Sequence, residues 1–202
     1  NGWLLSNIII REEILEACRA AVEQVYNGRY DRVHAWSDHL ENRSFGKKYT
    51  DRSQNRLDAY LSLHSTVLRK VLQAPEIARF AACLMDTNEV RLYRDILLTQ
   101  PQDEAASTGT GWHVDKNYWP TCTSTKMASA WFSLDNCGIE NGCLSVISGS
   151  QDWDPVVFFR KVDLPDLAKI GRMYGKVERV MWVVYVPHRA GQISFHHCQL
   201  IH

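Results

Sequence analysis

The hydrophobic pattern of this chain changes near Asn88, and the change limits the folds that the chain can adopt. Before Asn88, apolar residues recur at helical spacing in three segments, residues 11–27, 61–73 and 75–84. After Asn88, period-two alternation predicts strands over residues 90–98, 112–115, 127–134, 143–147, 177–186 and 192–202. Helices that are followed by a run of strands predict an α+β fold.

Several other segments complete this expectation. Residues 8–10 predict a short strand, Asn141-Gly142 predicts a turn, and Pro165 precedes a short predicted helix. Three segments, residues 32–57, 101–111 and 151–176, follow neither a helical nor a strand pattern, and we interpret them as loops that select the substrate. The first loop carries four basic residues, which suit either contact with an anionic substrate or a solvated loop: Lys47, Lys48, Arg52 and Arg56.

His113 and Asp115 are separated by a single residue. On a strand, side chains two residues apart project from the same face, so both can bind one metal ion while Val114 points away. One distant histidine would complete a set of two imidazoles and one carboxylate, which is the ligand set of non-haem Fe(II) oxygenases. Three histidines in the last predicted strand are candidates, although each also suits a hydrogen-bonded core position: His196, His197 and His202. Ligands drawn from two distant strands suit an antiparallel jelly roll.

Composition excludes several other classes of function. A chain of 202 residues predicts one domain, and 23 basic residues against 23 acidic ones argue against a nucleic-acid partner. No apolar run approaches the roughly 20 residues of a membrane span, and the first residues do not resemble a secretory signal. The six cysteines form no CxxC pair, which favours free thiols in a reducing cytoplasm. The sequence therefore predicts a cytoplasmic protein, of unknown oligomeric state.

From about residue 109 onward, the chain resembles the phytanoyl-CoA dioxygenase (PhyH) family of Fe(II)- and 2-oxoglutarate-dependent oxygenases. The resemblance rests on a set of motifs whose order and spacing agree. They are Trp112-His113-Val114-Asp115, Tyr118-Trp119-Pro120, Ala130-Trp131-Phe132-Ser133-Leu134-Asp135, Glu140-Asn141-Gly142-Cys143-Leu144, Ile147-Ser148-Gly149-Ser150, and Phe195-His196-His197 followed by Leu200-Ile201-His202. The opening Gly2-Trp3-Leu4-Leu5 also resembles the start of the family.

This resemblance implies a fold and a set of site residues. The implied fold is a double-stranded β-helix (jelly roll, cupin-like), with N-terminal helices packed on one sheet of a single domain over residues 1–202. His113, Asp115 and His202 become the iron ligands, because the distal ligand of the family follows a Leu-Ile pair. His196 and His197 then become neighbours of the ligands, with His197 the candidate for contact with them. Trp131 matches a position of the cosubstrate pocket, and it equally suits plain core packing. Tyr93 and Ile96 match positions of this pocket more weakly.

The implied activity is hydroxylation of a small organic substrate with Fe(II), 2-oxoglutarate and O2, releasing succinate and CO2. Asp115 favours hydroxylation, because related halogenases carry Gly or Ala there to free a site for chloride. Lys116 is a further candidate for contact with a substrate anion. Two alternatives remain: a metal-binding jelly roll without oxygenase activity, and a hydrolytic zinc enzyme, for which no additional general base is evident near the motif.

The family also carries an arginine about ten residues beyond the distal histidine, where it binds the C5 carboxylate of 2-oxoglutarate. His202 is the last residue of this sequence, and Arg189 precedes the final predicted strand. No residue therefore matches the arginine by position, and we expect the chain to be truncated, without its C-terminal strand or strands.

Overall fold

The computed structural model describes residues 1–32, 49, 55–101, 110–153, 166–175 and 181–202. The chain divides into two compact units, one of residues 1–9 and 108–202 and the other of residues 10–107. Antiparallel sheets form most of the first unit, and helices form most of the second, which confirms the α+β expectation. A single domain and the packing of helices on one sheet stay predictions.

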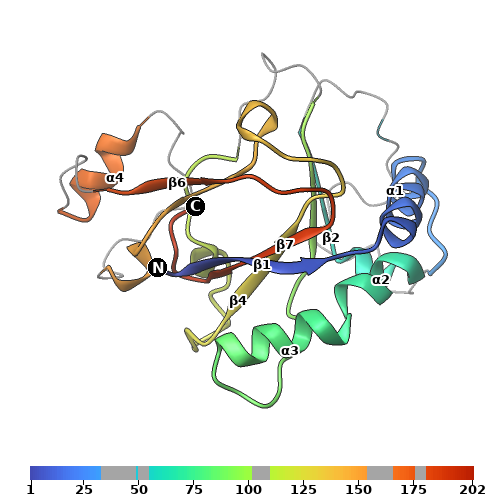
Figure 1. Cartoon of the computed structure of the whole chain (residues 1–202), viewed down its shortest axis with the longest axis horizontal. Coiled ribbons are helices and arrows are strands. Elements are labelled where there is room, and N and C mark those ends of the chain that lie inside the picture. Colours follow the sequence, from blue (N-terminus) through green and yellow to red (C-terminus); the bar gives the residue numbers. More distant parts are fainter. Residues whose placement is uncertain (33–48, 50–54, 102–109, 154–165, 176–180) are drawn as a thin grey trace. The chain divides into compact units, whose positions relative to one another are not determined.

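A three-stranded antiparallel sheet in the first unit has the order β1 (Trp3–Ile9), β7 (Gln192–His197) and β4 (Ala128–Phe132), seen in Figure 1. The predicted strand at residues 8–10 thus begins earlier, because Trp3 already pairs with His196 of β7. In β7, Ile193 and Phe195 are fully buried and alternate with residues of the opposite face. Pairing with β7, and not the local apolar run, sets the limits of β1.

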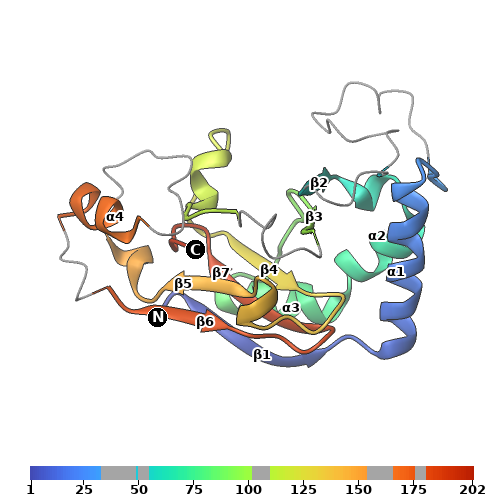
Figure 2. The same ribbon diagram turned by 90° about the horizontal axis from the view of Figure 1, so that it is seen from above.

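A second sheet pairs β5 (Leu144–Ile147) with β6 (Val183–Val186), which lie side by side in Figure 2. Val146 of β5, Val186 of β6 and the buried Leu200 form one apolar cluster, against which Trp3 and Leu5 of β1 pack. Side chains from both sheets therefore share a core. The predicted strand at 177–186 is confirmed over its second half, while residues 177–180 lie outside the described part.

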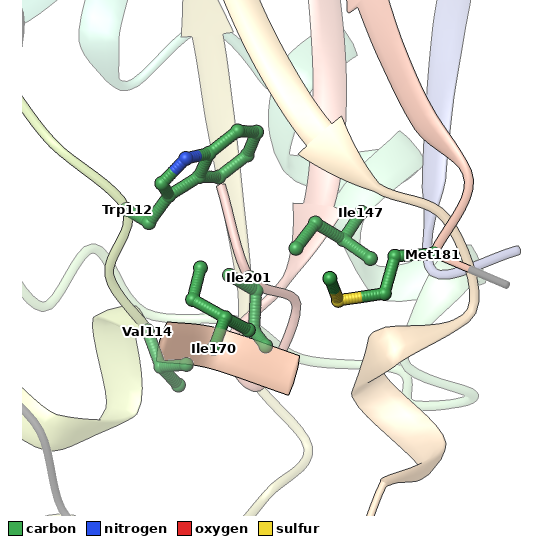
Figure 3. Close-up of a cluster of buried hydrophobic side chains, with 6 residues drawn as sticks. All are labelled: Trp112, Val114, Ile147, Ile170, Met181 and Ile201. Carbon is green, nitrogen blue, oxygen red and sulfur yellow. The ribbon is translucent and has the colours of Figure 1, made fainter. Parts of the chain in front are cut away.

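A further apolar cluster lies beneath the segments that carry the predicted ligands. It contains Trp112, Val114, Ile147, Ile170, Met181 and Ile201, shown in Figure 3. Ile170 comes from α4 (Leu167–Met173), the helix expected after Pro165, and Asp166 caps this helix by accepting a hydrogen bond from Lys169 N at 3.0 Å. Trp112 and Val114 flank His113, and Ile201 precedes His202, so this cluster fixes both segments that carry the predicted ligands.

Two strand expectations are wrong in detail at these segments. Residues 112–115 form no continuous strand. Trp112 and Val114 each lie in an isolated bridge, that of Val114 with Ile201, and a 3-10 helix begins at Asp115 and runs to Tyr118. The last strand ends at His197, where a turn closed by Leu200 N and His197 O at 2.9 Å reverses the chain. The turn contains no glycine or proline, so the sequence carries no turn signal there.

The second unit contains α1 (Glu12–Tyr26), α2 (Thr66–Leu72) and α3 (Pro75–Leu84), as the helical spacing predicted. Acidic residues occupy the first turn of α1, the Ser65 hydroxyl caps α2, and Pro75 opens α3. A 3-10 helix over Leu61–Leu63 precedes α2 and shortens the predicted helix. None of the helices in the described ranges is long and apolar enough to cross a membrane.

The second unit also holds an antiparallel pair of strands, β2 (Arg56–Ala59) and β3 (Ile96–Thr99). The predicted strand at 90–98 is wrong over its first half, because the Asp95 carboxylate binds the backbone N and the hydroxyl of Ser62. Arg56, expected in a solvated or substrate-binding loop, is buried in β2 and paired with the carboxylate of Asp58 at 2.7 Å. The remaining residues of that loop, 33–48 and 50–54, lie outside the described part.

Candidate metal centre

Three predicted ligands converge in the first unit. The Nε2 atoms of His113 and His202 lie 3.8 and 3.7 Å from Oδ1 of Asp115. One potential ligand atom from each residue lies within 4.8 Å of the others, and this is the sole group of its kind among the described residues. The side chain of His113 is 16% exposed, that of His202 is 7% exposed and that of Asp115 is 18% exposed. The three side chains are therefore mostly buried but still accessible to solvent.

Backbone hydrogen bonds bring the two segments together. His113 N donates to His202 O at 2.9 Å, and His202 N donates to His113 O at 3.0 Å. On its other side, the last segment is held by Ile147 N, which donates to Ile201 O, and by the Ser150 hydroxyl, which accepts from Ile201 N. Val114 and Ile201 point into the core cluster, so the side chains next to them in sequence face the opposite way.

The orientation of each ligand histidine is fixed by its own backbone. His113 Nδ1 lies 3.0 Å from Gly111 O, and His202 Nδ1 lies 2.9 Å from Leu200 O. A carbonyl oxygen only accepts hydrogen bonds, so the proton of each neutral ring is on Nδ1. Each Nε2 therefore presents a lone pair towards Asp115, as metal binding requires.

The carboxylate of Asp115 is held through its second oxygen. Oδ2 accepts hydrogen bonds from Ser129 Oγ at 2.5 Å and from His196 Nε2 at 3.2 Å. Ser129 on β4 and His196 on β7 are direct cross-strand neighbours, so one sheet supplies both donors. Oδ1 is left to face the two ligand histidines. Sequence reasoning missed Ser129 and named His196 only as one of three candidate histidines, because the contact of each with Asp115 depends on the strand register.

The electrostatics of the group favour metal-binding protonation states. Burial acts to raise the pKa of Asp115, but His202 and the hydrogen bonds from His196 and Ser129 more than offset it, so the pKa lies below its ordinary value. Burial and the neighbouring His196 lower the pKa of His202 to about 3. At neutral pH the site therefore offers a carboxylate and a neutral imidazole.

The donor set fits a divalent transition metal. Such ions bind imidazole nitrogen and carboxylate oxygen at about 2.0–2.2 Å, so two ligand atoms of one ion lie no more than about 4.2 Å apart. The separations of 3.7 and 3.8 Å between the histidine nitrogens and Oδ1 satisfy this limit. Two imidazoles and one carboxylate on one side of an ion match the arrangement of non-haem Fe(II) sites.

The other predicted site residues belong to two different units. Trp131 lies on the same face of β4 as Ser129, and its ring packs edge-on to that of His188. Tyr93 and Ile96 belong to the second unit and are about half exposed, so their cosubstrate role stays a prediction.

Two further candidates have other partners. The Lys116 ammonium donates to the carbonyls of Cys122 and Ser124, so its side chain closes a local loop. On β7, His196 contacts Asp115, whereas the next residue, His197, points to the other face. The expectation that His197 neighbours the ligands is therefore wrong, and His196 has that role.

Comparisons with known proteins agree with this geometry. The family described as phytanoyl-CoA dioxygenase (PhyH) matches residues 1–202. Peroxisomal phytanoyl-CoA dioxygenase of Bos taurus is 29% identical over 78 residues, which is 38% of this chain and 23% of that protein. The Homo sapiens protein is 28% identical over the same shares. The matched stretch thus spans about a quarter of the curated relatives.

Solved structures are similar over the whole chain. The carbocyclase SnoK of nogalamycin biosynthesis aligns with a TM-score of 0.71 at 22% identity, over 99% of this chain and 72% of SnoK. The epimerase SnoN, in complex with Fe3+, alpha ketoglutarate and nogalamycin RO, gives 0.69 at 22%, over 100% and 71%. EctD from S. alaskensis, with 2-oxoglutarate and 5-hydroxyectoine, gives 0.64 at 17%, over 100% and 65%. At these identities the likeness concerns the fold.

Proposed function

The chain belongs to the phytanoyl-CoA dioxygenase family, and from this premise we propose that it is an Fe(II)- and 2-oxoglutarate-dependent dioxygenase that hydroxylates a small organic substrate and releases succinate and CO2. The observation that carries the proposal is the convergence of His113, Asp115 and His202, with both histidines held in the tautomer that frees Nε2. The proposed fold is the double-stranded β-helix of the family, in a single domain over residues 1–202.

The residues of the site would have distinct roles in this reaction. His113, Asp115 and His202 hold the metal on one side and leave the other coordination positions for 2-oxoglutarate and O2. When bound, iron together with 2-oxoglutarate and O2 supplies the oxidising chemistry that cleaves a substrate C–H bond. Ser129 and His196 keep the Asp115 carboxylate oriented, and Trp131 lines the cosubstrate pocket. All six cysteines are free thiols, which supports a cytoplasmic location.

The similar solved structures carry the names of different reactions, so the reaction type of this chain needs a test of its own. The similar structures include an epimerase and a carbocyclase as well as EctD crystallised with 2-oxoglutarate and 5-hydroxyectoine. Asp115 supports hydroxylation over halogenation, because it occupies the position that a halide would need. Mass spectrometry of a metabolite extract incubated with the protein, Fe(II) and 2-oxoglutarate distinguishes the outcomes. Hydroxylation adds one oxygen, oxidative ring closure removes two hydrogens, and epimerisation leaves the mass unchanged.

The decisive experiment measures succinate formed from 2-oxoglutarate in the full-length protein with added Fe(II). We expect turnover in the wild type, loss of turnover in Asp115→Ala, and wild-type turnover in the control Asp152→Ala, whose carboxylate is exposed. Tight Fe(II) binding without succinate formation would instead support the alternative, a metal-binding jelly roll without oxygenase activity.

A further inference from the structure

A row of buried polar atoms continues from the metal centre along the inner face of β7. Ser194 and His196 project from the same face of this strand, because they are two residues apart. Ser194 lies opposite Trp131 of β4, and His196 lies opposite Ser129, which contacts Asp115. One step of two residues along a strand is about 7 Å, so Ser194 lies about that far from the residue that holds Asp115.

Ser194 is 1% exposed, and its hydroxyl has no hydrogen-bond partner within the described ranges. Most buried hydroxyl groups in proteins are hydrogen-bonded, and an unpaired one destabilises the fold. A hydroxyl in this state, one strand step from the histidine that contacts Asp115, indicates that a ligand supplies the missing partner.

His188 brings a second atom of this kind to the same place. Its ring centroid lies 4.4 Å from that of Trp131, and its side chain is buried, with the residue 3% exposed. Nδ1 lies 2.7 Å from Val186 O and therefore carries the proton of the neutral ring. Nε2 is buried without a partner in the described part of the chain. Trp131 thus lies beside both unpartnered groups.

We propose that Ser194 and His188 bind the distal carboxylate of 2-oxoglutarate, with Trp131 packed on the carbon chain between this carboxylate and the metal. The inference rests on the proposed function, which places the 2-oxo acid end of the cosubstrate on the metal. The five-carbon chain is long enough to carry its second carboxylate away from the metal, past Trp131 and towards the two polar groups.

This arrangement has a consequence for protons. Burial lowers the pKa of His188, although the hydrogen bond to Val186 opposes the shift, so the ring is neutral before the ligand binds. In the neutral ring Nε2 only accepts, and a carboxylate also only accepts. Binding must therefore take one proton from solvent, so that His188 donates to the carboxylate from Nε2. The charged side chains that line the adjoining hollow with His188 are Glu140 and Arg189, one of each sign.

Calorimetry of the Mn(II)-loaded, full-length protein under anaerobic conditions tests the inference without turnover. Titration with 2-oxoglutarate at pH 7.5, in buffers of different ionisation enthalpy, should show uptake of close to one proton. Titration with 2-oxobutyrate, which has the same metal-binding end but no distal carboxylate, should show none. We expect His188→Gln to abolish the uptake and to weaken 2-oxoglutarate about tenfold or more, and Ser194→Ala to weaken it about tenfold.

The matched control is His197→Gln, because His197 lies on the opposite face of the same strand and should leave both proton uptake and affinity unchanged. Mn(II) affinity, measured in each variant, verifies that the metal centre is intact. Tight binding of 2-oxoglutarate to the wild type without proton uptake would overturn the inference and leave the proposed function standing. Failure of the Mn(II)-loaded wild type to bind 2-oxoglutarate would count against the proposed function itself.

Discussion

The hydrogen bonds to Oδ2 of Asp115 predict a loss of metal affinity when either donor is removed. Ser129→Ala removes the donor at 2.5 Å, and His196→Phe removes the one at 3.2 Å while keeping an aromatic ring on β7. A hydrogen bond to a charged group contributes about 1.5–3 kcal/mol. Loss of a group that orients a metal ligand typically weakens metal binding about 10- to 100-fold. The shorter contact places Ser129→Ala in the upper part of this range.

Isothermal titration with Mn(II) or Co(II) measures the effect directly. The visible spectrum of the Co(II)-loaded protein reports in addition whether Asp115 still coordinates the ion. Ser133→Ala is the matched control, because its hydroxyl accepts from Asp135 N and does not contact Asp115. Metal affinities within twofold of the wild type in both Ser129→Ala and His196→Phe would refute the reasoning, because Asp115 would then be oriented without these donors.

Three further predictions concern stability and thiol chemistry. Asp58→Asn should destabilise the protein by about 3–5 kcal/mol in urea unfolding, because it removes the buried carboxylate charge that pairs with the Arg56 guanidinium. In the metal-free protein, stability should fall as the pH drops from about 6.5 towards 3, because His202 binds a proton in the unfolded chain but not in the folded one; a flat stability profile there would contradict this. At pH 8, iodoacetamide should modify the exposed Cys83 much faster than Cys198, whose pKa burial raises to about 11, as peptide mass mapping would show.

Local alternation predicted the parts of the site that depend on neighbouring residues. Val114 lies in the apolar cluster, and His113 and Asp115 face the other way, as period-two geometry requires even where the segment forms only a bridge. The helices of residues 10–107 were predicted for the same reason, because helical spacing and Pro75 are local signals. These features need no information about distant contacts.

The parts of the site that depend on long-range register were not predictable in this way. His196 and His197 are adjacent and equally plausible in the sequence, and the pairing of β7 with β4 decides which one faces Asp115. Likewise, the turn after His197 contains no glycine or proline, and its geometry depends on contacts such as Cys198 N with Met127 O. A single sequence contains no direct record of either pairing.

One local geometry recurs in three histidines of the first unit. His113, His188 and His202 each donate Nδ1–H to the carbonyl two residues earlier in the chain, so the backbone itself fixes which ring nitrogen is free. What distinguishes them is the partner opposite Nε2. Two face Oδ1 of Asp115 and can share a metal with it, whereas His188 faces no carboxylate within the described residues. The tautomer of each histidine is therefore set by the local backbone, and its role is set by the groups that the fold places opposite Nε2. Two of these histidines can bind a metal together with Asp115, and the third, His188, can bind a ligand.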